Sequence, residues 1–144
     1  MFSKACEYAI RSSIFIAGQT MKQRRVGLKE VAKAIDSPEA YTSKILQQLT
    51  KSKIINSEKG PNGGFMMDKK SLEVIKLSNV VYAIDGDGIY KGCALGLKRC
   101  NEKIPCAMHF DFKAIRDQLK LMLETTSIKS LAIEHHEGLT FLKR

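Results

Sequence analysis

Three of the four cysteines in this 144-residue chain are gathered in one short segment. Six residues separate Cys93 from Cys100, five separate Cys100 from Cys106, and His109 follows after two more. Thiolates and imidazole are ligands for iron–sulfur clusters and for tetrahedral zinc, and three thiolates with one further ligand complete either site. Flexible glycines around the first cysteine would let the loop wrap a compact centre, and they are Gly88, Gly92 and Gly96. The segment therefore predicts a metal or redox centre.

The cysteine segment leaves several chemistries open. An iron–sulfur cluster of the two-iron or four-iron type is the first interpretation. A zinc site is the alternative, because the spacing is close to that of small Cys-Cys-Cys-His zinc fingers. Free thiols that exchange disulfides, or inert cysteines, are further alternatives. Cys6 stands alone on the packing face of a helix and is expected to be a small buried residue.

The segments before the cysteines predict a helix-turn-helix. Small and apolar residues recur at helical spacing over residues 2–19, and again over residues 28–35. Ser37 is expected to cap a third helix that has Pro38 in its first position and runs to about Lys51. Its buried face would be Thr42, Ile45, Leu46 and Leu49. Two short helices joined by so tight a turn are typical of a helix-turn-helix.

The outward face of the third helix is suited to nucleic acid. It carries small, hydrogen-bonding or cationic side chains, namely Ala40, Ser43, Lys44, Gln47 and Lys51. Cations contact phosphates, and hydrogen-bonding groups read base edges in the major groove. The face therefore predicts a DNA-recognition helix, with an ordinary solvated helix as the alternative.

A glycine-rich hairpin is expected directly after this helix. Strand-like residues 54–57 and 65–67 flank a tip that contains Lys59, Gly60 and Asn62. A cation, an amide and a flexible backbone at the tip would allow close approach to another surface. The hairpin is interpreted as a DNA-contacting wing, and a plain hairpin is the alternative.

The second half of the chain predicts one long helix. Residues 75–84 read as strand remnants or as a short helix, and a long helix follows from about Ala107 to Thr125. Its apolar residues alternate in steps of three and four, the seam pattern of paired helices, at Phe112, Ile115, Leu119, Met122 and Thr126. Ser127 is expected to cap a last short helix.

These elements give a fold that is mainly α with a small β wing. Residues 1–84 are predicted to form a winged helix-turn-helix DNA-binding domain, and residues 85–106 a cysteine-containing sensor loop. Residues 107–144 are predicted to be a dimerisation helix and a C-terminal tail that packs with the first helix.

The charge of the chain favours a polyanionic partner. There are 24 Lys and Arg residues against 15 Asp and Glu, a net charge of +9. Basic surfaces release condensed counterions from nucleic acid, although a membrane surface or a basic enzyme would also fit this balance. No apolar run approaches the roughly 20 residues that span a bilayer, and the N-terminus lacks an apolar signal core. A cytoplasmic protein with no membrane partner is expected.

The sequence resembles the Rrf2 family of bacterial winged-helix transcription regulators over nearly the whole chain. The matching stretches include residues 7–11, 44–49, 75–86 and the three cysteines, and the wing motif at 57–65 is the most specific. The resemblance implies a homodimer that is held by the long helix and binds a roughly palindromic operator in double-stranded DNA. It also implies a sensor of redox, nitric oxide or iron–sulfur status.

The resemblance offers two candidates for a fourth cluster ligand. His109 matches the histidine of IscR-like members, and Glu7 aligns with an acidic ligand that NsrR-like members supply from the partner subunit; we favour His109. Thr42 stands where leucine is common, which is expected to loosen the recognition helix. Lys59 stands where arginine is common, and its point charge suits a phosphate or minor-groove contact better than bidentate guanine recognition.

The sequence predicts a regulator and not an enzyme. Neither a phosphate-binding glycine motif nor a Cys-x-x-Cys pair is present. The alternatives to a cluster-bearing regulator are a zinc-stabilised or cluster-free winged-helix DNA binder, and a basic redox protein.

Overall fold

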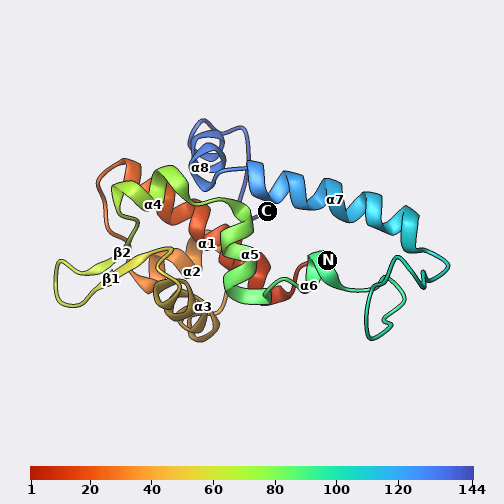
Figure 1. Cartoon of the computed structure of the whole chain (residues 1–144). Helices are drawn as coiled ribbons and strands as arrows, with labels where there is room; N and C mark the ends of the chain where they lie inside the picture. The colour runs from red at the N-terminus through yellow and green to blue at the C-terminus, as the bar shows by residue number, and fades with distance from the viewer.

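Helix α1 is the central element of the fold, and five other elements pack on it. The computed structural model describes residues 1–144, as a mainly α-helical protein with one two-stranded sheet (Figure 1), which confirms the expected fold class. Helices α2, α3, α5 and α8 and strand β2 all contact α1. In chain order the elements are α1 (Lys4–Met21), α2 (Leu28–Ile35), α3 (Glu39–Lys51), β1 (Asn56–Glu58), β2 (Gly64–Met66), α4 (Lys69–Val74), α5 (Leu77–Asp85), α6 (Gly88–Lys91), α7 (His109–Thr125) and α8 (Ile128–His136).

Helix α1 is longer at its C-terminal end than the sequence predicted. Its start is fixed by Ser3, whose hydroxyl accepts a hydrogen bond from the Cys6 backbone N–H at 3.0 Å. The helical pattern was expected to end at residue 19, but the helix continues through Gly18 to Met21. The chain turns only at Gln23, which adopts a positive φ of 56°.

The turn between α2 and α3 is closed by a threonine. Asp36 ends α2 in the left-handed conformation, and α3 begins after Pro38. The expectation that Ser37 caps α3 is wrong, because no side chain caps this end of the helix. The Thr42 hydroxyl instead lies 3.0 Å from Ser37 Oγ and 2.9 Å from the Pro38 carbonyl oxygen. Thr42 is fully buried, so it ties the first turn of α3 to the preceding loop and does not loosen the helix.

The expected hairpin is present, with its first strand later than predicted. Strand β1 pairs antiparallel with β2, so that Ser57 lies opposite Phe65. Ile54 and Ile55 precede the strand and are buried in the core. Val26 pairs with β2 on its other edge as an isolated antiparallel bridge. It exchanges two backbone hydrogen bonds with Phe65, of 3.0 and 2.8 Å.

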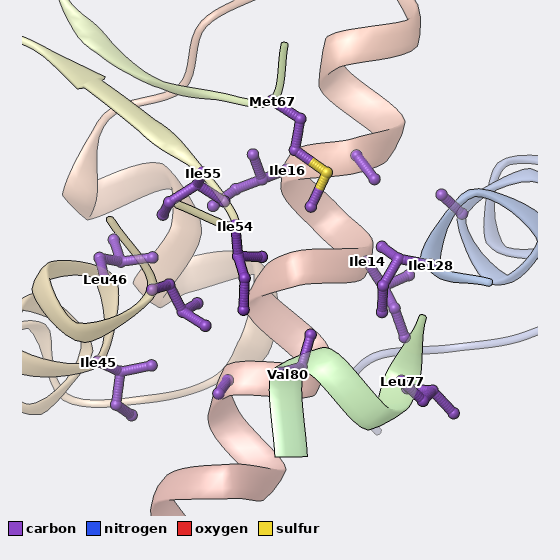
Figure 2. Packing of buried hydrophobic residues seen from close by; sticks show 14 of the residues in the cluster. Ile14, Ile16, Ile45, Leu46, Ile54, Ile55, Met67, Leu77, Val80 and Ile128 are labelled. Carbon is purple, nitrogen blue, oxygen red and sulfur yellow. The ribbon is translucent and has the colours of Figure 1, made fainter. Parts of the chain in front are cut away.

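One apolar core joins the helix-turn-helix to the later helices. Figure 2 shows Ile14 and Ile16 of α1 among side chains from α3, the residues flanking the hairpin, α5 and α8. Residues 77–85 form helix α5, so the short-helix interpretation is confirmed over the strand interpretation. Cys6 is fully buried in this core, as expected, and burial, followed by the charge of Asp85, raises the pKa of its thiol to about 12.

Helix α7 extends beyond this core. Figure 1 shows it leaving the helices packed on α1, with the cysteine segment at its far end and the wing on the opposite side of the molecule. Leu123 is its one fully buried apolar residue, whereas Ile115 and Met122 are 56% and 45% exposed. Helix α8 returns to pack on α1, and Ser127 caps it as predicted. None of the helices has the length and apolar character needed to cross a bilayer.

Gly64 is the backbone position that brings the wing against the rest of the fold. Its φ is +130°, and a Cβ atom at this position would lie 2.8 Å from the Val26 carbonyl oxygen. We expect Gly64→Ala to lower the free energy of unfolding by about 1–3 kcal/mol, because strain and a backbone clash add together. Urea unfolding followed by circular dichroism measures the change.

The matched control is Gly18→Ala in α1. Nothing lies within 4 Å of a Cβ atom at Gly18, and its backbone is helical. This variant should gain about 0.5–1 kcal/mol, because alanine is the better helix residue. Equal unfolding free energies for Gly64→Ala and the wild type would contradict the role given to Gly64.

Candidate functional site

The outward face of α3 presents the polar side chains predicted for it. Lys44, Gln47 and Lys51 are exposed, and Ser43 is half-buried. Gln47 Nε2 lies 3.5 Å from Ser43 Oγ, one helical turn away, so these two hydrogen-bonding groups stand side by side. Since Thr42, Ile45, Leu46 and Leu49 are buried, the opposite face anchors the helix in the core.

A groove runs between α3 and the wing. It has a volume of about 470 Å³ and is lined by Ser43, Gln47, Thr50, Lys51, Ser57, Lys59 and Phe65. The structure thus brings three of the predicted α3 residues together with Lys59 of the wing. Lys44 lies on α3 outside the groove, and Gly60 and Asn62 are exposed at the wing tip. Sequence reasoning missed Thr50 and Ser57, because helical spacing alone does not indicate where a hairpin lies against a helix.

The charge of this groove is uncompensated. Its two cations, Lys51 and Lys59, form no ion pair with a carboxylate, and neither does Lys44 outside the groove. The acid nearest in sequence to the wing tip, Glu58, pairs instead with Arg25 at 2.8 Å. The groove therefore offers unpaired cations beside hydrogen-bonding side chains. This combination suits nucleic acid, whose phosphates attract cations and whose base edges form hydrogen bonds.

The cysteine site is built from two pairs of side chains. Cys93 Sγ lies 3.7 Å from Cys106 Sγ, and Cys100 Sγ lies 3.3 Å from His109 Nδ1. All four cysteines of the chain are free thiols. No three potential ligands come together around a single point. The site therefore has the form of two neighbouring ligand pairs and not of one four-ligand cage.

His109 is the most deeply buried member of the site. It begins α7, is only 4% exposed, and packs edge to face against Phe110 with ring centroids 5.0 Å apart. Its Nδ1 faces Cys100, whereas Nε2 is buried without a hydrogen-bond partner. A buried imidazole with one nitrogen beside a thiol is suited to metal ligation, and the role of His109 as a ligand stays a prediction.

Arg116 belongs to the site and was missed by sequence reasoning. It lies on α7 seven residues after His109, which places both on one face of the helix. Its guanidinium donates to the Gly92 carbonyl oxygen and, at 3.2 Å, to Cys100 Sγ. Hydrogen bonds from the Leu97 and Leu95 backbone lower the pKa of the Cys93 thiol, and the Arg116 charge adds to this effect.

A cationic cavity opens beside Cys100 and His109. Its volume is about 510 Å³, and its charged lining comprises five cations and one acid: Lys91, Lys98, Arg99, Lys113, Arg116 and Glu102. The cavity gives small solutes access to this half of the site. Since the wing and the cysteine segment lie at opposite ends of the molecule (Figure 1), the groove along α3 and this cavity are separate surfaces.

The alternative ligand Glu7 does not reach the cysteines of its own chain. It is exposed on α1 and pairs with Lys4 at 3.0 Å. This ion pair is its only side-chain partner, so nothing joins it to the cysteine segment. Its predicted role across a dimer interface stays a prediction.

The sequence and the fold are similar to those of known regulators. The family model Rrf2, described as an iron-dependent transcriptional regulator, matches residues 2–134. The regulator NsrR of Oceanobacillus iheyensis is 26% identical over 85% of this chain and 84% of its own length. The regulator IscR of Photorhabdus laumondii is 22% identical over 86% of this chain and 74% of its own. The structure of CymR, the global cysteine regulator of B. subtilis, matches with a TM-score of 0.73 at 20% identity, covering 92% of this chain and 96% of that one.

Proposed function

The chain belongs to the Rrf2 family of transcription regulators, and we propose that it acts as a homodimer that binds a palindromic operator and senses redox, nitric oxide or iron–sulfur status through a cysteine-ligated cluster. Its family and its relatives are transcription regulators and not enzymes. The observation that carries the DNA-binding proposal is the groove where α3 meets the wing, with its free cations and hydrogen-bonding side chains.

The side chains in and around the groove support two kinds of DNA contact, to phosphates and to bases. We assign Lys51 in the groove and Lys44 outside it to phosphate contacts. Ser43 and Gln47 are assigned to the recognition of base edges in the major groove. At the wing tip, Lys59, Gly60 and Asn62 would follow the adjacent backbone or minor groove. Gly60 has a φ of +100°, and a Cβ atom placed there would meet no other atom within 4 Å, so the tip is open to a second surface.

The two ligand pairs favour a two-iron cluster for the sensor. Two thiolates on one tetrahedral metal, with bonds of about 2.3 Å, lie roughly 3.8 Å apart. The 3.7 Å between Cys93 and Cys106 fits this distance, and the 3.3 Å between Cys100 and His109 is close to that of a sulfur–nitrogen pair. In a [2Fe–2S] cluster each iron takes two protein ligands, whereas in a [4Fe–4S] cluster each takes one. Such a cluster would supply one-electron redox chemistry and a centre that oxidants or nitric oxide degrade.

A zinc-stabilised DNA binder is the second candidate function. The Cys93–Cys106 distance would also suit two ligands of one zinc ion. A single zinc ion, however, needs all four ligands around one point, and the third and fourth ligands form a separate pair. Zinc would therefore require a rearrangement of the loop that brings the two pairs together around one ion.

The dimer proposal rests on the apolar side chains that α7 leaves exposed. A homodimer with paired α7 helices would cover Ile115 and Met122 and present two recognition helices about 34 Å apart, one turn of DNA. We expect the wild type to sediment as a dimer at micromolar concentration, and Ile115→Lys or Met122→Lys to sediment as monomers. Ala114→Lys is the control, because Ala114 is exposed on another side of the same helix. A monomeric wild type, with and without DNA, contradicts the dimer.

The recognition face is tested by DNA binding at several salt concentrations. Lys44→Ala and Lys51→Ala should weaken binding to every duplex and reduce the salt slope by about one each, since each removes a phosphate contact. Ser43→Ala and Gln47→Ala should change which base is preferred, by about 1–3 kcal/mol per lost contact. Lys120→Ala on α7 is the control and should change neither quantity. The recognition-helix assignment is wrong if all five variants behave alike.

The cluster is tested by absorption spectra and iron content after anaerobic reconstitution. Cys93→Ser, Cys100→Ser and Cys106→Ser should each lose the chromophore, because a missing thiolate opens a coordination position to water and oxygen. Cys6→Ser should keep it, since Cys6 is buried in the core away from the loop.

The fourth ligand is decided by His109→Ala against Glu7→Ala. Loss of iron in the first variant alone supports the local site, and loss in the second alone supports a ligand from the partner subunit. A colourless wild type with stoichiometric zinc would overturn the sensing proposal and leave the DNA-binding proposal intact.

A further inference from the structure

Arg116 is a buried cation without a carboxylate partner. The residue is only 8% exposed, yet its guanidinium takes part in no ion pair. Its two terminal nitrogens donate to the Gly92 carbonyl oxygen and to Cys100 Sγ, and its Nε is buried with no partner at all. A side chain that always carries its charge is thus held at the centre of the cysteine site.

A buried charge needs a compensating charge of opposite sign. Removal of a guanidinium from water costs several kcal/mol in rough terms unless an anion and hydrogen bonds offset the loss. The carbonyl oxygen of Gly92 supplies a dipole only. Of the groups hydrogen-bonded to Arg116, the sulfur of Cys100 is the one able to carry a full negative charge. Thiols become thiolates when they ligate a metal. The position of Arg116 is therefore accounted for when the cysteines hold a metal centre.

We propose that Arg116 is the counter-ion of the cysteine-ligated centre and that it raises the reduction potential of the cluster. The inference rests on the proposed cluster function and adds a positioning residue that is not itself a ligand. Hydrogen bonds and positive charge at ligand sulfurs favour the reduced state, because one-electron reduction adds negative charge at the site. The guanidinium keeps its proton throughout, so the electron is compensated by a fixed charge and not by proton uptake.

Arg116 also connects the loop to α7. Its two hydrogen bonds join the residue before Cys93 to Cys100, which belongs to the other ligand pair. A purely structural role would need these two hydrogen bonds but not the charge. Lysine keeps a positive charge on a flexible stem and cannot donate from a planar fork to both groups, whereas glutamine donates but carries no charge. Comparison of the lysine and glutamine variants therefore separates the effect of the positive charge from that of the hydrogen bonds.

The experiment measures the midpoint potential of the anaerobically reconstituted full-length protein by spectroelectrochemical titration with mediator dyes. Arg116→Gln should shift the ratio of oxidised to reduced cluster at least tenfold toward the oxidised form, a fall of about 59 mV for a one-electron couple. Arg116→Lys should recover most of this shift. Lys113→Gln is the matched control, because Lys113 lines the same cavity from α7 but has a side chain that is 42% exposed and paired with Asp117 at 2.9 Å. Its potential should equal that of the wild type.

The possible results distinguish a failure of the role given to Arg116 from a failure of the proposed cluster. Equal potentials for the wild type and Arg116→Gln, at equal iron content, overturn the role of Arg116 and leave the cluster in place. A folded Arg116→Gln protein that takes up no iron, while Arg116→Lys does, supports the inference, because the variants differ in charge. A wild type that assembles no cluster overturns both.

Discussion

Apolar packing around α1 is the interaction on which every other part of the molecule depends. Ile16 and Ala17 are completely buried there, and full burial of one large aliphatic side chain contributes about 1.5–3 kcal/mol. Because α3 and the residues flanking the wing share this core with α5 and α8, tertiary packing orients α3, the proposed recognition helix. Its outward polar face is thereby left exposed for the proposed DNA contact, since the opposite face anchors the helix.

The cysteine site is held by a different kind of interaction. Away from the core, the loop is fixed by short α6, by the buried His109 and by the hydrogen bonds of Arg116. Segments with few buried apolar contacts open at lower free energy than the core. A metal centre that binds there would contribute its binding free energy directly to the order of the loop. Loss of the centre would therefore affect this end of the molecule first.

Sequence patterns predicted what is local and periodic, and failed where contacts join distant segments. The amphipathic faces of α2 and α3, the wing and the burial of Cys6 follow from spacing and turn chemistry. The Ser37 cap was wrong, because Thr42 takes that hydroxyl as a partner. No sequence pattern indicated that Arg116 belongs to the cysteine site, since a single arginine in a basic chain is normally interpreted as an exposed surface charge. Its role depends on a loop that folds back over α7.

A continuous set of packed elements connects the cysteine site to α3 within one chain. His109 and Arg116 lie on α7, and the far end of α7 is tied to the α5 region by backbone hydrogen bonds: Leu77 N–H to the Thr126 carbonyl at 3.0 Å, and Ile128 N–H to the Ile75 carbonyl at 3.1 Å. Helix α5 in turn packs on α3. Coupling along this path requires two states of the loop that bind DNA with different affinity. In the proposed regulator, the magnitude of that difference limits how far a signal at the cysteines can change the occupancy of DNA. DNA must then shift the chemistry of the cysteines by the same free energy in return.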